Sequence, residues 1–197
     1  EQDMRKMGGL FSKLPLTGTM MWIGSLAIIG FPFFSGYYSK ESIIEHAYFA
    51  NSNIGLYAYL VGILTALLTA FYSWRLLFMT FHGTSNLQEN IFNDIKESPK
   101  VMTTPLVILS IGSIFSGFFL FNYFIGSEQN NFWNGSVIVA QEYKQHMPFL
   151  QSLIIKLLVS IGIFLAAIIY FYKKELSTWL ADNLKPVYSI LYNKWFV

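Results

Sequence analysis

The sequence predicts an all-α membrane protein, a polytopic transmembrane helix bundle with about four spans. Hydrophobic residues make up 54% of the 197-residue chain and charged residues only 12%, about half the charged fraction of an average soluble domain. The apolar residues also lie in continuous blocks that reach about 20 residues, the length that an α-helix needs to cross a bilayer. We therefore expect a single membrane domain over residues 1–197, with polar loops at 84–103 and 126–147.

The first predicted span, residues 15–49, contains a break. A continuous helix of this length would be about 50 Å long, whereas the hydrocarbon core of a bilayer is about 30 Å thick. Pro32 removes a backbone donor and clashes with the preceding turn, and Gly30 and Gly36 loosen the chain on either side. Broken helices at membrane depth require protein or a watery cavity to satisfy the freed backbone groups. The sequence therefore predicts packing or a cavity of that kind beside Pro32.

Three further spans and a polar-apolar tail follow the broken one. Two of these spans open with a proline, Pro105 and Pro148, at a position where a helix tolerates it. The tail mixes aromatic and aliphatic residues with four lysines and suits an amphipathic segment lying along the membrane surface. The expected bounds are about 54–81, 104–125 and 148–172 for the spans, and 173–197 for the tail.

The basic residues predict the orientation of the chain. If the spans alternate in direction, the N-terminal segment, the 84–103 loop and the tail share one side of the membrane. That side carries nine basic residues, whereas the opposite side carries only Lys144. By the positive-inside rule the basic side is the cytoplasm of a bacterium or the matrix of a mitochondrion, so we expect an inner membrane. The nine are Arg5, Lys6, Lys13, Lys96, Lys100, Lys173, Lys174, Lys185 and Lys194.

Lys40 and Glu41 directly follow the break and are the main candidate site residues. An ionisable side chain within a span costs roughly 2.5–3.5 kcal/mol on insertion scales, so its presence there indicates a function or a stabilising partner. On one interpretation both residues have reached the far interface, about 37 Å along a straight helix from Pro15. On the other, the break shortens the path and leaves Lys40 near the bilayer middle, in a water-lined cavity. There, desolvation would let a lysine load and release a proton near neutral pH.

Four more ionisable residues are secondary candidates. Glu45 lies four residues after Glu41 on one helical face, so the two carboxylates repel each other and one of them can hold a proton. His46 can titrate in the physiological range, although Glu45 and His46 also suit a helix end at the water boundary. Arg75 suits a side chain that extends from the end of the second span to the headgroups. Lys156, about 12 Å into the fourth span, fits either an outward anchor or an inward polar track.

Several kinds of site are not expected. The chain has no cysteine, which excludes disulfides and thiolate metal sites. No pair of histidines or carboxylates has metal-ligand spacing, and no glycine-rich phosphate loop or nucleophile motif is present. The net charge of +2 is too small to indicate a nucleic-acid partner. Because the chain begins at Glu1 without an initiator methionine and ends within an aromatic run, we expect a fragment of a longer polypeptide.

A set of short motifs runs along the chain. The most specific is Gly30-Phe31-Pro32 followed by Ser35-Gly36-Tyr37-Tyr38-Ser39-Lys40-Glu41. Together the motifs resemble the antiporter-type membrane subunits of respiratory complex I, and most closely subunit L of the bacterial enzyme and subunit 5 of the mitochondrial one. The other motifs are Met7-Gly8-Gly9-Leu10, Lys13-Leu14-Pro15, Phe71-Tyr72-Ser73-Trp74-Arg75, Phe81-His82-Gly83 and Leu191-Tyr192-Asn193-Lys194-Trp195-Phe196-Val197.

The resemblance implies the C-terminal part of a proton channel with two broken helices, of which this chain holds the second. It implies that Lys40 is the terminal proton-carrying site, near the exit to the positive side. Glu41 stands where the family usually has aspartate, and the resemblance implies that it tunes the pKa of Lys40. The Pro32 break would give water access.

The resemblance also implies proton translocation within an NADH:quinone oxidoreductase. This chain would hold no cofactor, and NADH, FMN, iron–sulfur clusters and quinone would lie in partner subunits. The partners would be other complex I membrane subunits, especially the adjacent antiporter-like one, together with the lipid bilayer. Two alternatives are a subunit of a multi-subunit cation/proton antiporter and a truncated, non-pumping membrane protein with a structural role only.

Overall fold

The predicted all-α fold class is confirmed by the computed structural model, which describes residues 3–137, 147–173 and 175–193. Regular structure in these residues is helical throughout. Three helices, α3, α5 and α7 with its π-helical continuation η3, are long and apolar enough to cross a membrane. The elements in chain order are η1 (Met4–Lys6), η2 (Leu10–Ser12), α1 (Pro15–Ile29), α2 (Ser35–Phe49), α3 (Asn53–Phe81), α4 (Glu89–Asp94), α5 (Lys100–Phe124), α6 (Gln129–Trp133), α7 (Phe149–Ala167), η3 (Ile168–Tyr172), α8 (Glu175–Asn183) and α9 (Lys185–Tyr192).

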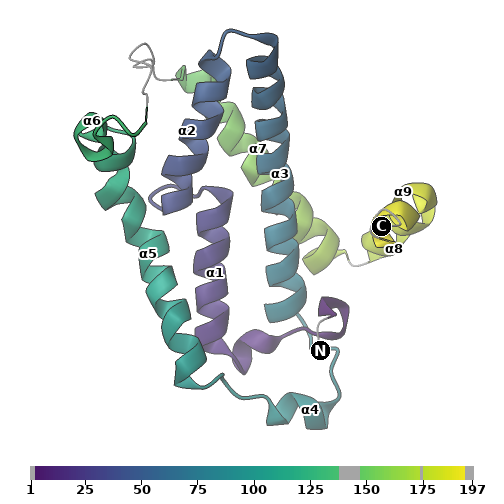
Figure 1. Ribbon diagram of the computed structural model, residues 1–197. Helices are drawn as coiled ribbons and strands as arrows, with labels where there is room; N and C mark the ends of the chain where they lie inside the picture. The colour runs from purple at the N-terminus through teal and green to yellow at the C-terminus, as the bar shows by residue number, and fades with distance from the viewer. Residues whose placement is uncertain (1–2, 138–146, 174, 194–197) are drawn as a thin grey trace.

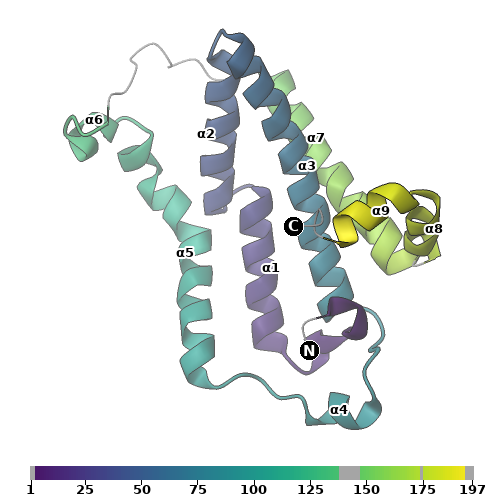
Figure 2. The ribbon, with the colours of Figure 1, turned by 45° about the vertical axis from the view of Figure 1, so that its right-hand side comes forward.

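The α1 and α2 helices take the place of the first span. Each has 15 residues and is therefore about 22 Å long, too short to cross a hydrocarbon core alone. Figures 1 and 2 show that α2 continues in the direction of α1 after a sideways step, and that the two lie along α3. The pair together extends over a length similar to that of α3, as a broken span would.

Hydrogen bonds that are characteristic of a helix C-terminus end α1. Gly30 adopts a left-handed conformation, with φ of 79°, which glycine reaches without steric cost. Its N–H donates to the Ala27 carbonyl at 3.1 Å, and the Phe31 N–H donates to the Leu26 carbonyl at 3.0 Å. This pair of bonds is the Schellman pattern. Pro32 then lies in the link between the two helices, so the break is built from local backbone chemistry.

The two helices approach very closely at the break. A Cβ atom placed on Gly36, in the first turn of α2, would lie 1.8 Å from the Ala27 carbonyl oxygen of α1. Only a residue without a side chain permits this approach. The end of α1 is therefore packed directly against the start of α2, so that protein fills the space beside the break.

The α3 helix is the centre of the bundle and packs against α1, α2 and α7. Its contact with α7 is made by small residues. A Cβ on Gly162 of α7 would lie 2.6 Å from the Leu67 carbonyl oxygen, and Ala66, Ala70 and Ala166 are fully buried. Small side chains let helix backbones approach closely inside membranes, so α3 and α7 form a tightly joined pair.

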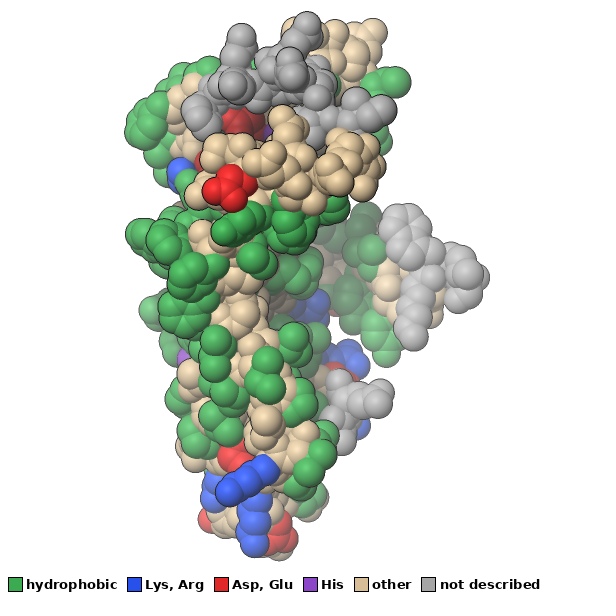
Figure 3. Space-filling model, turned by 60° about the vertical axis from the view of Figure 1, so that its left-hand side comes forward, with side chains coloured by type: hydrophobic (Ala, Val, Ile, Leu, Met, Phe, Trp, Pro, Cys, Tyr) green, Lys and Arg blue, Asp and Glu red, His purple; other side chains and the backbone are tan. Residues whose placement is uncertain are grey.

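The α5 helix lies on the opposite side of the bundle, against α1 and α2. Hydrophobic side chains cover much of the face that it presents in Figure 3, and Lys and Arg side chains gather at one end of that face. Such a distribution suits a helix whose outer surface contacts lipid or another subunit. The exposed apolar residues of α5 include Ile108, Leu109, Ile111, Phe115, Phe118 and Phe119.

The N-terminal segment and the 84–99 loop meet at the same end of the bundle. Lys13 donates to the Asn93 side-chain carbonyl at 3.3 Å, and Asn86 donates to the Arg5 carbonyl at 3.1 Å. These contacts agree with the prediction that the two segments lie on the same side of the membrane. The compartment that they face stays a prediction. Lys144, Lys174 and Lys194, which also entered the orientation argument, lie outside the described residues.

The predicted tail forms the short helices α8 and α9, which contact each other, and α8 also contacts η3. Tyr192 at the end of α9 lies near the N-terminal segment, with the Arg5 guanidinium carbon 6.0 Å from the centre of its ring. A cation at this distance from a tyrosine ring is weakly attracted to it. The placement of the tail along a membrane surface stays a prediction.

Candidate functional site

A cavity of about 260 Å³ lies between the α1–α2 break and α7. Its walls are largely apolar, and three charged side chains line it: Lys40 and Glu41 from α2, and Lys156 from α7. The two sequence-predicted main residues and one secondary candidate therefore share a single cavity. The remaining lining residues are Ile29, Gly30, Phe31, Pro32, Tyr37, Ile44, Ser152, Ile155, Val159, Ser160 and Ile163.

Lys40 reaches from α2 back to the end of α1. Its ammonium Nζ lies 3.4 Å from the Ile28 carbonyl oxygen, in the last turn of α1. The carbonyls at a helix C-terminus carry partial negative charge and favour a cation. The structure puts Lys40 half-buried in the second turn of α2, beside the break. Whether this position lies near the bilayer middle or at the far interface stays a prediction.

Glu41 points across the cavity to α7. Its Oε1 atom accepts a hydrogen bond of 2.7 Å from the Ser152 hydroxyl and lies 3.8 Å from the Lys156 ammonium. The side chain of Glu41 is 26% exposed and that of Lys156 is 47% exposed. Glu41 was expected to act on Lys40, its neighbour in sequence, and the structure pairs it with Lys156 of a different helix.

Tyr37 completes the group of polar side chains around Lys156. The Lys156 ammonium lies 5.4 Å from the centre of the Tyr37 ring, within the distance at which a ring attracts a cation. Tyr37 and Glu41 are four residues apart on α2, and Ser152 and Lys156 are four residues apart on α7. Residues at this spacing share one helical face, so a polar face of α2 meets a polar face of α7.

The polar contact between α2 and α7 continues from the cavity to the end of the bundle. Glu45, one turn after Glu41, accepts a hydrogen bond from the Met147 N–H just before α7. Gln151 donates to the Tyr48 hydroxyl at 3.3 Å. Glu45 therefore lies against the N-terminus of α7, where a negative charge is favourable.

The remaining two secondary candidates lie apart from the cavity. His46 is exposed near the end of α2, and its Nδ1 atom lies 2.7 Å from the Ser42 carbonyl, which requires a proton on that nitrogen. The Arg75 guanidinium on α3 lies 5.1 Å from the centre of the Tyr170 ring on η3. Neither residue lines the cavity. The functional roles assigned to His46 and Arg75 from the sequence stay predictions.

Sequence reasoning did not single out two members of this site, Tyr37 and Ser152. The signal that marks them is their spacing of four residues from Glu41 and Lys156, respectively. In the part of the chain that the structure describes, no group of three or more His, Cys, Asp or Glu side chains could hold a metal ion. The polar side chains that line the cavity, Lys40, Glu41, Lys156, Tyr37, Ser152 and Ser160, can form ion pairs and hydrogen bonds.

Comparison with known families covers almost the whole chain. Residues 72–197 match the family described as NADH dehydrogenase subunit 5 C-terminus. The chain belongs to this family. Residues 1–69, which contain Lys40 and Glu41, match the transmembrane family described as NADH:quinone oxidoreductase/Mrp antiporter. The predicted relationship to subunit 5 and subunit L is confirmed.

Individual relatives of the subunit 5 family agree. The chain is 39% identical over 207 residues to NADH-ubiquinone oxidoreductase chain 5 of Phytophthora infestans, a match that covers all of this chain and 30% of that protein. It is 38% identical over 178 residues to NADH-quinone oxidoreductase subunit L of Rickettsia bellii, with 89% of this chain and 27% of that protein covered. The chain thus spans about a third or less of the length of the curated relatives that it matches.

Proposed function

We propose that this chain is the C-terminal part of a proton-translocating subunit of an NADH:quinone oxidoreductase, and that Lys40 carries the proton at the α1–α2 break. The observation that carries the proposal is the cavity at that break, where Lys40, Glu41 and Lys156 lie together. Ionisable groups inside membrane helices mark ion pathways and proton relays because they are otherwise too costly to keep. The family relationship supports the same activity for the whole subunit.

Lys40 is placed to exchange a proton with the cavity. The ammonium touches a carbonyl on one side and borders the cavity on the other, so water in the cavity can accept the proton. Pro32 and the end of α1 line this cavity.

The proposal places the redox chemistry elsewhere. NADH, FMN, iron–sulfur clusters and quinone are assigned to partner subunits, and the energy reaches this chain through the adjacent antiporter-like subunit. The membrane is a bacterial or mitochondrial inner membrane. The N-terminal segment and the tail face the cytoplasm or matrix, as the distribution of basic residues predicts.

A Lys40→Ala substitution in the full-length subunit tests the proposal. We expect NADH-driven proton pumping to fall about tenfold or more, and electron transfer to fall with it. This is a smaller loss than the factor of about 100 or more that a proton-transferring side chain contributes in enzymes. The measurement is proton pumping in membrane vesicles, scored against NADH oxidation and the amount of assembled complex. Lys100→Ala is the matched control, since Lys100 is an exposed lysine at the start of α5. Normal pumping by an assembled Lys40→Ala complex would remove Lys40 from the proton path.

A second candidate function is cation/proton antiport within a multi-subunit antiporter. The family that matches residues 1–69 includes antiporters by its description, and the site residues Lys40 and Glu41 lie in that part of the chain. Pumping assays in sodium-free and sodium-containing buffers separate the two functions. Proton movement that depends on sodium and persists without NADH would favour the antiporter.

A further inference from the structure

Three charged groups share the cavity, and their pairing is not the one that the chain order indicates. Glu41 follows Lys40 directly, yet its carboxylate interacts with Lys156, more than a hundred residues further along the chain. Adjacent residues of an α-helix point in directions about 100° apart. Lys40 therefore faces the end of α1, at the Ile28 carbonyl, while Glu41 faces α7.

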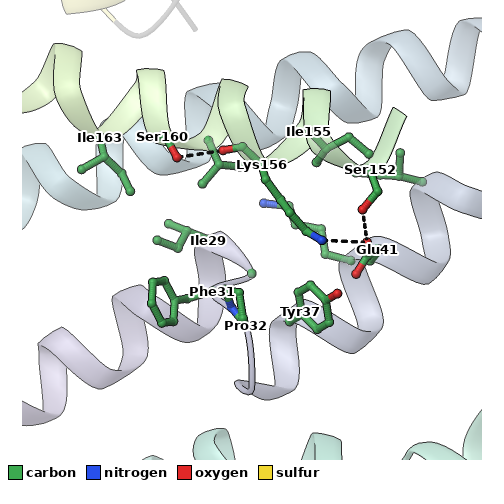
Figure 4. A pocket seen from close by; sticks show the side chains of 14 residues that line it. Ile29, Phe31, Pro32, Tyr37, Glu41, Ser152, Ile155, Lys156, Ser160 and Ile163 are labelled. Atoms are coloured by element: carbon green, nitrogen blue, oxygen red, sulfur yellow. Dashed lines mark hydrogen bonds and ion pairs between the residues drawn. The ribbon is translucent and has the colours of Figure 1, made fainter. Parts of the chain in front are cut away.

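Two groups from one face of α7 hold the Glu41 carboxylate. The Ser152 hydroxyl donates to Oε1 at 2.7 Å, and the Lys156 ammonium lies 3.8 Å from the same atom. Figure 4 shows both side chains converging on Glu41 from α7. A hydroxyl and an ammonium on one carboxylate oxygen fix its direction more strongly than a single contact.

Lys156 is in turn held by two side chains of α2. The Tyr37 ring and the Glu41 carboxylate both lie beside its ammonium. Lys156 also lies about 10 Å along α7 from Phe149, within the apolar part of this helix. A charged lysine within an apolar helix is energetically costly unless an opposite charge lies beside it, and Glu41 supplies that charge.

The α7 helix packs closely on α3 further along the helix from Lys156. Gly162 and Ala166 follow Lys156 on α7 and pack against α3 without room for an added methyl group at Gly162. The ammonium is thus presented to Glu41 from a helix pair that close packing holds together.

We infer that Lys156 is a positioning residue of the proton site, which ties the Glu41 carboxylate to α7 and leaves the Lys40 ammonium with the carbonyl end of α1. This inference rests on the proposed function and deepens it, because it makes α7 part of the site and assigns Glu41 a partner other than Lys40. The other interpretation of Lys156, an outward membrane anchor, becomes an outcome of the test.

A double-mutant cycle in the full-length subunit within its assembled complex tests the inference. The variants are Glu41→Gln, Lys156→Met and the double variant, each measured for proton pumping per assembled complex. If the two residues act as a pair, each single variant lowers pumping about tenfold. The double variant then pumps within about twofold of the single variant that pumps less, since the effects of substitutions at residues in contact are not additive. Lys156→Arg keeps the charge and should retain pumping within about threefold of wild type.

Two results would overturn the inference. One is full pumping by Lys156→Met, which makes Lys156 an anchor only. The other is multiplication of the two losses in the double variant, which makes the residues independent. If Lys156→Met does not accumulate, the same cycle is scored on the amount of assembled complex. The double variant should then accumulate as Glu41→Gln alone does, because it no longer contains an uncompensated carboxylate, and failure to do so also counts against the pair.

The cycle is independent of the Lys40→Ala experiment. Coupling between Glu41 and Lys156 with normal pumping by Lys40→Ala would retain the pair and reject Lys40 as the carrier. Loss of pumping in Lys40→Ala with uncoupled Glu41 and Lys156 would retain the proposed function and reject the positioning role.

Discussion

The tight join between α1 and α2 makes Gly36 sensitive to substitution. A Cβ atom at Gly36 would lie 1.8 Å from the Ala27 carbonyl oxygen and 2.9 Å from the Ala27 carbonyl carbon. Since Cβ contacts are essentially never shorter than 3.0 Å, the helices must separate by at least 1.2 Å, the difference between 3.0 and 1.8 Å. Overpacking of this kind costs about 1–3 kcal/mol or more, whereas alanine gains only about 1 kcal/mol over glycine in a helix. The net effect of Gly36→Ala is therefore destabilisation of the break.

The functional consequence follows from the position of Gly36, one turn before Lys40. Moving the start of α2 away from α1 withdraws Lys40 from the Ile28 carbonyl and displaces Glu41 from Ser152 and Lys156. We expect Gly36→Ala in the full-length subunit to lower NADH-driven proton pumping per assembled complex about fivefold or more, the equivalent of about 1 kcal/mol.

Two other helical glycines are matched controls for this experiment. Gly24 in α1 and Gly112 in α5 have no atom within 4 Å of an added Cβ, so their alanine variants should pump as wild type does. The measurement is proton pumping in membrane vesicles, with complex content determined in parallel. Pumping by Gly36→Ala at the level of Gly24→Ala and Gly112→Ala would refute the conclusion that the close join is required.

The remaining predictions concern the packing around the site and one end of the bundle. Ser152→Ala should lower pumping roughly twofold to tenfold, the equivalent of one hydrogen bond, in the same vesicle assay, and unchanged pumping would show that the hydroxyl does not hold Glu41. Gly162→Ala should lower the thermal unfolding midpoint of the detergent-solubilised subunit, whereas Gly112→Ala should not, because only Gly162 meets a backbone carbonyl, that of Leu67 at 2.6 Å. Glu97 caps the start of α1 by accepting hydrogen bonds from the N–H and the hydroxyl of Thr17. Glu97→Gln should lower the same midpoint near pH 7, by the equivalent of a lost helix cap at about 0.5–2 kcal/mol, and an unchanged midpoint would mean that the cap is not stabilising.

The Glu97 prediction also has a pH dependence. Partial burial raises the pKa of the Glu97 carboxyl, but hydrogen bonds to it from Thr17 and from the Leu16 and Ser98 backbone outweigh this, so the pKa lies below its ordinary value. A lowered folded-state pKa stabilises the fold at pH values above the unfolded-state pKa of about 4.3. That contribution disappears as the pH falls through the folded-state pKa. The difference in midpoint between wild type and Glu97→Gln should therefore shrink on acidification, and a constant difference would contradict the assignment.

Local features of the sequence were sufficient to predict the fold class and the broken first span. The apolar runs are long enough to require membrane helices, and Gly30 and Pro32 act on the backbone within one or two residues of themselves. The candidate residues Lys40 and Glu41 were also found locally, since a charged pair within an apolar region is costly. Features that depend on the immediate chain were thus accessible without a structure.

Contacts between distant parts of the chain were not accessible in the same way. Ser152 and Glu41 are 111 positions apart, and no pattern in either segment specifies which helix α7 packs against. For this reason the sequence left Lys156 open between an anchor and a polar track, and assigned Glu41 to its neighbour Lys40. The cap on α1 is a similar case. Leu14 at its N-cap position supplies no side-chain hydrogen bond. Glu97, which is 80 positions from Thr17, accepts hydrogen bonds from the Thr17 N–H at 3.1 Å and from the Thr17 hydroxyl at 2.8 Å.

The close packing of α7 on α3 affects how the charged cavity can respond to movement elsewhere in the membrane. Because Gly162 and Ala166 bring the two backbones together, α3 and α7 act as one mechanical body, and Lys156 is fixed to it. Lys40 and Glu41 lie on the short helix α2, which follows the Pro32 link and packs against α1, α3 and α5. The energy of two charges varies inversely with their separation, so a displacement of α2 against the α3–α7 body alters the attraction between Glu41 and Lys156. The ion pair would then convert a small mechanical shift of one helix into a change of electrostatic potential at the cavity that Lys40 lines.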